Sequence, residues 1–398
     1  MRMLKHVVIK GGRFCAIISS VALVGVASRT FADSIVVDGV TWNYTVNGDG
    51  STVTLNGVNG NEQAKTANPS FSAAHIPWTF TNNDTSYTVT SFAAKLFQDW
   101  TNLTGELTIP GTVKGTLGVF QGCSGLTRLT LEEGLEEFSW YIFKNCKFIV
   151  GGVIVPSTVT TIPGGSFSWD QRITAAWIKG GATADAKTKF TVRSAFYGGQ
   201  QLKFLLFGKN TQGDQLNHSE TLLDDKANGC VVYVPDNGGW GKGTWSSNIG
   251  GNNTVLRYYG PGCDVDIATD DQNNIITVSP TTAETLQEAL NLAPVFKSAL
   301  GLDMKVSITN RIATVVTIPD AAYSSVMFDL HSWVTFKVET QQQLENTLAS
   351  ISADSMVIID PDDATETLTV PEGRQVFVLM KEGDKIRIRP SGLVLYVK

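Results

Sequence analysis

The sequence predicts a mainly β protein with short helices and turns: a solenoid of stacked coils, preceded by a β cap and followed by a strand-rich α+β region. Three observations lead to this expectation. A phenylalanine recurs at a nearly constant interval, apolar pairs of the form L-x-L accompany it, and Gly makes up 38 of 398 residues. Only 17% of residues are charged while 42% are apolar, which excludes a disordered tail, a coiled coil and a basic nucleic-acid binder.

An export signal is expected in residues 1–32. Basic residues up to Arg13 precede an apolar stretch from Phe14 to Ala27, and Ala32 ends a site that a signal peptidase would read. The stretch is shorter than the ~20 residues that span a bilayer, so cleavage is expected rather than anchoring. Without this segment the chain has 26 basic and 37 acidic residues, a net charge of −11. We therefore expect a secreted or cell-surface protein with no membrane span after signal removal and no nucleic acid as partner.

The repeat is clearest between residues 97 and 167, where four phenylalanines follow one another at nearly equal intervals. One coil cannot bury its apolar face alone, so stacked coils share a continuous interior, and alternate side chains of each strand point into it. We expect residues 91–235 to form this solenoid. Its repeat core is expected to contain Phe97, Phe120, Phe143, Phe167, Leu126, Leu129 and Leu131.

The run FQGCSGLTRLTLEEGLEEFSWYIFKNC resembles the leucine-rich repeats of BspA-like bacterial surface proteins, and the resemblance extends over about residues 33–260. It implies a leucine-rich-repeat solenoid with an N-terminal β cap at residues 33–90. It also implies a non-catalytic protein that binds or adheres to an extracellular protein or glycan. Asp170 stands where the repeat has Cys, and residues 180–189 lengthen one coil.

Outward positions of the L-x-L strands form the candidate binding face. These positions are Thr108, Arg128, Thr130 and Ile154. Solenoids present such rows on one extended surface, although threonine also suits strands for structural reasons. Three tryptophans are further candidates for stacking on sugars, with packing in the core as the simpler interpretation: Trp177, Trp240 and Trp245.

The C-terminal part changes character after a Gly-rich loop or linker at residues 236–262. Two α+β units are expected, at 263–337 and 338–398, as weak copies in which Thr281 corresponds to Thr340; short strand stacks fit equally well. The motifs Thr281-x-x-Glu284 and Thr340-x-x-Gln343 predict capping boxes that open two helices. The second copy resembles the entry of parallel β-helix proteins. An alternative function is therefore a polysaccharide-active or polysaccharide-binding protein.

No catalytic, cofactor-binding or metal-ligating residues are predicted. Motifs such as H-E-x-x-H and G-x-S-x-G are absent from the sequence. Cys123 and Cys146 occupy equivalent places on neighbouring coils, where two buried thiols are favoured over a disulfide. Cys230 and Cys263 flank the Gly-rich loop, and either a disulfide that closes the loop or two separate thiols fit there.

Overall fold

The computed structural model places every described residue in one compact unit, Ala32–Lys398. Among these residues no helix is long and apolar enough to cross a membrane. The predicted export signal lies outside the described part of the chain. The described residues are 33–58, 71–114, 118–181, 188–190, 194–213, 222–223, 228–237, 240, 251–382, 385–390 and 394–395.

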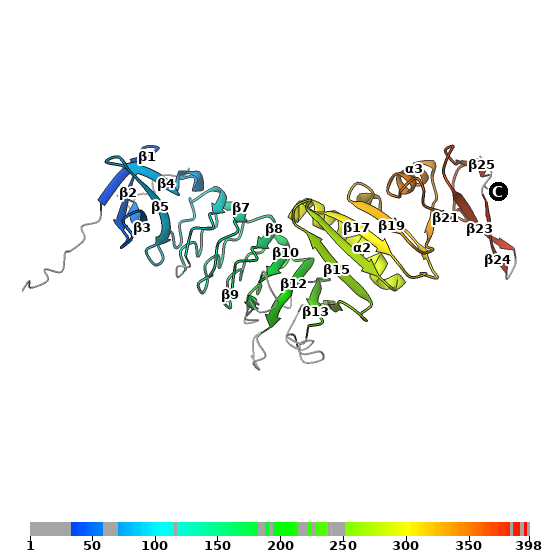
Figure 1. Cartoon of the computed structure of the whole chain (residues 1–398), viewed down its shortest axis with the longest axis horizontal. Coiled ribbons are helices and arrows are strands. Elements are labelled where there is room, and N and C mark those ends of the chain that lie inside the picture. Colours follow the sequence, from blue (N-terminus) through cyan, green and yellow to red (C-terminus); the bar gives the residue numbers. More distant parts are fainter. Residues whose placement is uncertain are drawn as a thin grey trace, which may run out of the picture. The chain divides into compact units, whose positions relative to one another are not determined.

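The N-terminal region is a five-stranded sheet with the order β1-β2-β3-β5-β4 (Figure 1). Its buried Trp42 lies with its ring centroid 6.2 Å from that of Phe97, so the sheet shares its core with the first coil. The five strands are β1 (Asp33–Val37), β2 (Val40–Val46), β3 (Thr52–Val58), β4 (Thr79–Asn82) and β5 (Thr85–Phe92).

Parallel strands of successive coils follow, in cyan and green in Figure 1. In β7, Leu129 and Leu131 are buried while Arg128 and Thr130 are exposed, as the two-residue period of a strand requires. β6 and β7 pair with each other, and the other long strands form a sheet in the order β8-β10-β12-β13-β14. The strands are β6 (Gly105–Ile109), β7 (Leu126–Leu131), β8 (Gly151–Val155), β9 (Thr161–Ile162), β10 (Ile173–Gly180), β11 (Thr188–Phe190), β12 (Phe204–Gly213), β13 (Val231–Pro235) and β14 (Val255–Tyr259).

The recurring phenylalanines form an internal stack. Centroid distances from Phe97 to Phe120, on to Phe143 and on to Phe167 are 5.4, 6.1 and 5.6 Å, with ring planes within 16° of parallel. Phe196 continues the stack at 5.2 Å, although its distance from Phe167 along the sequence is longer than the other intervals. The longer spacing therefore lengthens one coil without interrupting the column of rings.

The buried thiols of Cys123 and Cys146 lie on the coils that form this stack. The Cys123 Sγ donates to the Phe97 carbonyl at 3.0 Å, and the Cys146 Sγ donates to the Phe120 carbonyl at 3.1 Å. Each thiol therefore hydrogen-bonds to the preceding coil rather than to the other cysteine. Asp170 is buried at the next equivalent place, where its Oδ1 accepts from the Cys146 backbone N–H at 2.7 Å.

The region predicted as a linker contains a further strand. β14 pairs in parallel with β13, from Val231 opposite Val255 to Pro235 opposite Tyr259. An irregular loop throughout 236–262 was therefore the wrong expectation. The β-prone segment VLRYY adds one strand to the solenoid sheet, which the surrounding glycines obscure in the sequence.

Two helices and short strands make up the C-terminal region. α3 begins after Thr340, whose side chain accepts from the Gln343 N–H as the motif predicts. α2 is capped one residue later than expected, by Thr282 with Thr285. The elements are β15 (Val265–Asp270), β16 (Ile275–Pro280), α2 (Ala283–Val295), η2 (Phe296–Leu300), β17 (Asp303–Ile308), β18 (Val315–Val316), η3 (Asp320–Ala322), β19 (Val326–Leu330), β20 (Thr335–Lys337), α3 (Gln341–Ala349), β21 (Val357–Asp360), β22 (Leu368–Thr369), β23 (Val376–Glu382), β24 (Lys385–Pro390) and β25 (Val394–Leu395).

Most of these strands form two mainly parallel sheets, with the orders β15-β16-β17-β19 and β18-β20-β21-β23-β24, while β22 pairs with β25. The register places Met304 opposite Val326 and Thr335 opposite Ile358. The sequence separation between these paired residues is much shorter than the separation between Thr281 and Thr340, which defines the two predicted copies. Neighbouring strands of the sheets are therefore not equivalent strands of the two copies. β20 and β21 pair across the predicted boundary at residue 338, so the strand-stack alternative describes this region better than two independent units.

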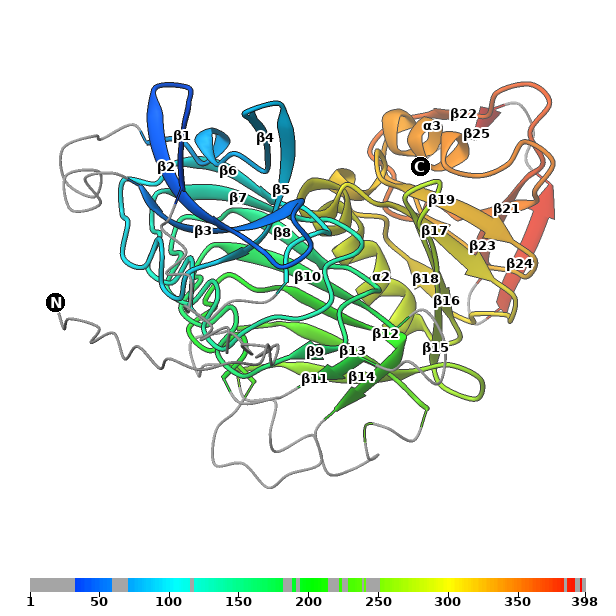
Figure 2. The same ribbon diagram turned by 60° about the vertical axis from the view of Figure 1, so that its left-hand side comes forward.

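The C-terminal region packs on the strand face of the last coils (Figure 2). Trp177, Phe204 and Tyr233 point away from the solenoid interior and form a second core with residues of α2 and η2. The Phe204 and Phe296 rings meet edge to face at a centroid distance of 4.1 Å. Helix packing therefore buries the outer faces of β10, β12 and β13.

Candidate binding groove

The predicted binding residues lie on the neighbouring strands β6, β7 and β8. Thr108 is directly opposite Thr130 in the β6–β7 register. Arg128 and Thr130 are exposed, whereas Thr108 and Ile154 are half-buried. The pleat of parallel strands turns the four side chains away from the solenoid interior.

Three of these residues, Arg128, Thr130 and Ile154, line a groove with a volume of about 330 Å³. The opposite wall comes from the end of η2, residues 299–301. Thr108 is not among the lining residues. The sequence thus indicates the strand wall, whereas the second wall exists only because the C-terminal region packs beside it.

Gly152 lines this groove at the point where β8 meets η2. A Cβ at Gly152 would lie 2.6 Å from the Ala299 carbonyl oxygen and 2.4 Å from the Leu300 Cδ2. Real side chains do not tolerate such a separation from backbone atoms, so the close approach of η2 to β8 requires a glycine there.

The side chain of Lys179, which also lines the groove, connects the solenoid to the C-terminal region through two ion pairs. Its Nζ lies 3.1 Å from Glu133 Oε1 and 2.8 Å from Asp271 Oδ2. Burial lowers the pKa of Lys179, but the hydrogen bonds to Asp271 and Glu133 outweigh that effect and leave the pKa above its ordinary value. The Lys179 charge is therefore already compensated within the chain.

The Glu133 carboxylate also has its partners within the chain. Burial raises its pKa, but Lys179 and the N–H and hydroxyl of Ser157 outweigh that effect, and the pKa is lowered overall. Arg128, by contrast, forms no ion pair or hydrogen bond through its side chain with any part of the chain that the structure describes. The groove thus presents one uncommitted guanidinium, a group suited to carboxylate or phosphate ligands.

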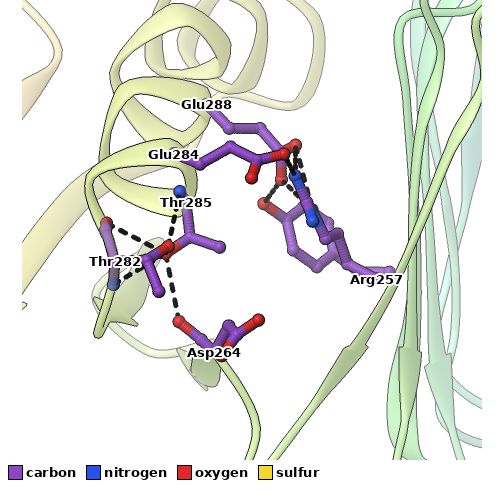
Figure 3. A network of polar contacts seen from close by, with 7 residues as sticks. Arg257, Asp264, Thr282, Glu284, Thr285 and Glu288 are labelled. Carbon is purple, nitrogen blue, oxygen red and sulfur yellow. Dashed lines mark hydrogen bonds and ion pairs between the residues drawn. The ribbon is translucent and has the colours of Figure 1, made fainter.

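A second polar cluster, shown in Figure 3, joins α2 to the solenoid. Arg257 of β14 binds Glu284 and Glu288, the latter with Nη2 at 3.2 Å from Oε2. The Tyr233 hydroxyl also donates to Glu288. Burial, followed by the nearby Glu288 carboxylate, raises the pKa of Tyr233 well above its usual value. Each of these side chains has a partner within the cluster, which connects α2 to β13 and β14.

The start of α2 is held by a separate set of hydrogen bonds. The Thr285 hydroxyl donates to the Asp264 carbonyl at 3.0 Å, and the Thr285 N–H donates to the Thr282 hydroxyl at 3.2 Å (Figure 3). A Ser or Thr at the capping position satisfies backbone N–H groups that a helix leaves without partners. The first turn of α2 is therefore fixed to the loop before β15.

Two of the three tryptophans considered for sugar binding are buried. Trp177 is buried in the second core and Trp240 in the solenoid core, while Trp245 lies outside the described residues. The exposed aromatic side chains of the solenoid include Trp140, Tyr141 and Trp169. Sequence reasoning missed them because their exposure depends on the turn conformations of two coils.

The disulfide considered between Cys230 and Cys263 is not formed. Cys230 points into the solenoid core, where burial raises its pKa to about 12. The Cys263 Sγ instead contacts Asp236 Oδ2 at 3.6 Å. The two thiols lie in different environments because β14 separates them. Within the described residues no group of three or more His, Cys, Asp or Glu side chains gathers as metal ligands.

Comparison with known proteins supports the repeat assignment. Residues 90–212 match the family described as BspA type Leucine rich repeat region, in six copies. The chain therefore carries BspA-type leucine-rich repeats. A search of curated proteins finds no match.

The solved structures found to be similar include three leucine-rich repeat proteins of low sequence identity. The leucine-rich repeat protein of T. pallidum is 18% identical, with a TM-score of 0.31, and the match covers 43% of this chain and 83% of that one. A leucine-rich repeat protein from Bacteroides ovatus is 14% identical, with a TM-score of 0.31, covering 82% of this chain and 99% of that one. A leucine rich cell surface protein from Faecalibacterium prausnitzii is 16% identical, with a TM-score of 0.28, covering 81% and 98%.

Proposed function

We propose that this chain is an exported, non-catalytic binding protein of the cell surface or the surrounding medium, which takes an extracellular macromolecule on the open strand face of β6 to β8. The observation that carries the proposal is the groove beside β7 and β8. The C-terminal region covers the strand face of β10, β12 and β13, but the face of β6 and β7 stays open and polar.

The chemistry of this face favours an acidic or hydrogen-bonding ligand. Arg128 has no partner in the described part of the chain, and Thr130 beside it offers a hydroxyl. Half-buried Ile154 supplies apolar contact area. Interfaces combine such an apolar centre with a polar rim, and arginine is among the residues that most often dominate their energy.

The test is a binding array of extracellular-matrix proteins and glycans probed with residues 33–398. We expect Arg128→Glu to weaken binding of the ligands found by at least about tenfold, since truncating or reversing an interface arginine commonly costs that much. Arg311→Glu makes the same charge change at an exposed position outside the groove and should leave affinity unchanged. No bound ligand, or equal loss in the two variants, would refute the groove as the binding site.

The alternative is a polysaccharide-active protein, and the parallel strand stack of residues 275–379 is the feature that favours it. Incubation with a panel of polysaccharides followed by an assay of new reducing ends distinguishes the two. The non-catalytic proposal expects no increase in reducing ends above that of a heat-denatured sample.

A further inference from the structure

Exposed apolar side chains concentrate on two neighbouring coils of the solenoid. Of the nine large hydrophobic residues that are exposed in the described chain, five lie between residues 140 and 169. Four of these five are aromatic. Their exposed fractions are 43% for Trp140, 40% for Tyr141, 44% for Phe148, 46% for Val150 and 37% for Trp169. Clusters of this kind on a soluble protein mark interaction sites.

The rings of Tyr141 and Trp169 lie over glycines of the following coil. A Cβ on Gly165 would be 2.6 Å from Tyr141 Cε1, and a Cβ on Gly198 would be 2.9 Å from Trp169 Cε3. Each ring therefore takes the space that a side chain of the next coil would otherwise occupy. One face of each ring contacts the backbone of the next coil, and the rest of the ring stays partly exposed to solvent.

Both aromatic residues adopt a backbone conformation that favours glycine. Tyr141 has φ 63° and Trp169 has φ 67°, a region that bulky residues rarely adopt. Two coils therefore carry large, partly exposed rings in a strained conformation, which points to a role beyond packing on the next coil. Glycine stands at some of the equivalent places in other coils: Gly118 and Gly165 match Tyr141, and Gly122 and Gly198 match Trp169. The remaining equivalent places hold smaller or flexible polar residues with positive φ, namely Lys95, Ser194, Asp99 and Asn145, so only these two coils carry an aromatic ring there.

Basic side chains lie over two of these aromatic rings. The Lys144 Nζ lies 4.6 Å from the centroid of the Tyr141 ring, and the Arg172 guanidinium carbon lies 4.7 Å from that of Phe148. Neither cation, nor the exposed Lys147 between them in sequence, pairs with a carboxylate in the described part of the chain. This local positive charge contrasts with the net negative charge of the whole chain.

We infer that Trp140, Tyr141, Phe148 and Trp169, with Lys144, Lys147 and Arg172, form a second binding site, and that its ligand is an acidic polysaccharide. The negative face of an aromatic ring attracts the C–H face of a sugar ring, and the cations complement carboxylate or sulfate groups. Rings on successive coils also suit a polymer of repeating units. The site is separate from the groove beside β7 and β8, so either can fail without the other.

The test measures binding of heparin and polygalacturonate, two acidic polysaccharides, to residues 33–398 by affinity electrophoresis and calorimetry. Neutral dextran and single-stranded DNA are the comparison ligands. We expect Tyr141→Gly combined with Trp169→Gly to lower affinity for at least one acidic polysaccharide by about tenfold or more. Because both substitutions introduce the residue that neighbouring coils already use, folding and thermal stability should be preserved.

The matched control is Trp333→Ala, which removes an exposed aromatic ring from the C-terminal region and should leave binding unchanged. Lys144→Gln with Arg172→Gln should weaken binding of the acidic polysaccharides and reduce its dependence on salt. Absence of binding to both polysaccharides would overturn the inference. So would an unchanged affinity in the double glycine variant, or binding that is as tight to dextran or tighter to DNA.

Discussion

Asp170 shows how a single residue departs from the repeat. The thiols of Cys123 and Cys146 donate to carbonyls of the preceding coils, and a carboxylate cannot donate. Asp170 Oδ1 accepts from the Cys146 N–H, whereas Oδ2 has no partner in the described structure. Burial raises the pKa of this carboxyl well above its usual value. The folded protein therefore favours the neutral acid at this position.

This assignment predicts a pH-dependent penalty. With a pKa higher in the folded than in the unfolded state, Asp170 costs no stability below its unfolded pKa of about 3.9. As pH rises from there toward the folded pKa, the free energy of unfolding falls by about 1.4 kcal/mol per pH unit. Asp170→Asn keeps the acceptor for Cys146 and cannot ionise.

Urea unfolding of the two proteins at pH 4 and pH 7 provides the measurement. We expect Asp170→Asn to be more stable than the parent at pH 7 by a margin that nearly disappears at pH 4. Asp170→Cys should behave similarly, because it restores the repeat residue. A margin that does not change with pH would show that the carboxyl carries no ionisation penalty.

At the scale of elements, the aromatic stack holds the coils together. Phe120 is 1% exposed and lies between the rings of Phe97 and Phe143. We expect Phe120→Ala to lower the free energy of unfolding by about 3–5 kcal/mol, since it removes a buried ring and leaves a cavity. The exposed Phe148→Ala is the control, with an expected loss below about 1 kcal/mol. Chemical denaturation measures both, and equal losses would contradict a central role for the stack.

The coils also show what sequence patterns can indicate. Spacing alone predicts the positions of Phe97 to Phe167 because each coil must place one ring in the same column. It does not predict β14, since the glycines around VLRYY suggest a loop and only pairing with β13 makes that segment a strand. The duplication proposed for the C-terminal region concerns the order of helix and strand, which α2–β17 and α3–β21 share, and it does not give the strand pairing. Similar helix–strand segments recur at one interval, but strand pairing joins residues at a much shorter one, as Met304 and Val326 show.

For the whole molecule, the polar cluster between Arg257 and Glu288 links the solenoid to the C-terminal region. Their side chains are only 19% and 11% exposed. Glu288→Ala would leave the guanidinium with Glu284 alone and the Tyr233 hydroxyl without its acceptor. We expect a loss of about 1–3 kcal/mol in the free energy of unfolding, because partly buried polar groups then lose partners.

Glu136→Ala serves as the comparison. It removes an ion pair with Lys114 in which both side chains are more than half exposed, so the expected loss is below about 1 kcal/mol. Raising the salt concentration should diminish this smaller effect more than the larger one, because exposed charges are screened more strongly. If the two substitutions cost the same, the cluster would not stabilise the junction as proposed.

Residue patterns alone were enough to predict the period of the coils, the inward side chains of each strand and the cap of α3, because these features depend on neighbours along the chain or on a regular repeat. Tertiary structure alone decided which outward faces remain accessible. Trp177 and Arg128 both point away from the solenoid interior, yet η2 and α2 bury the first and leave the second open. That difference arises from packing between segments that are far apart in the sequence, which local patterns do not encode.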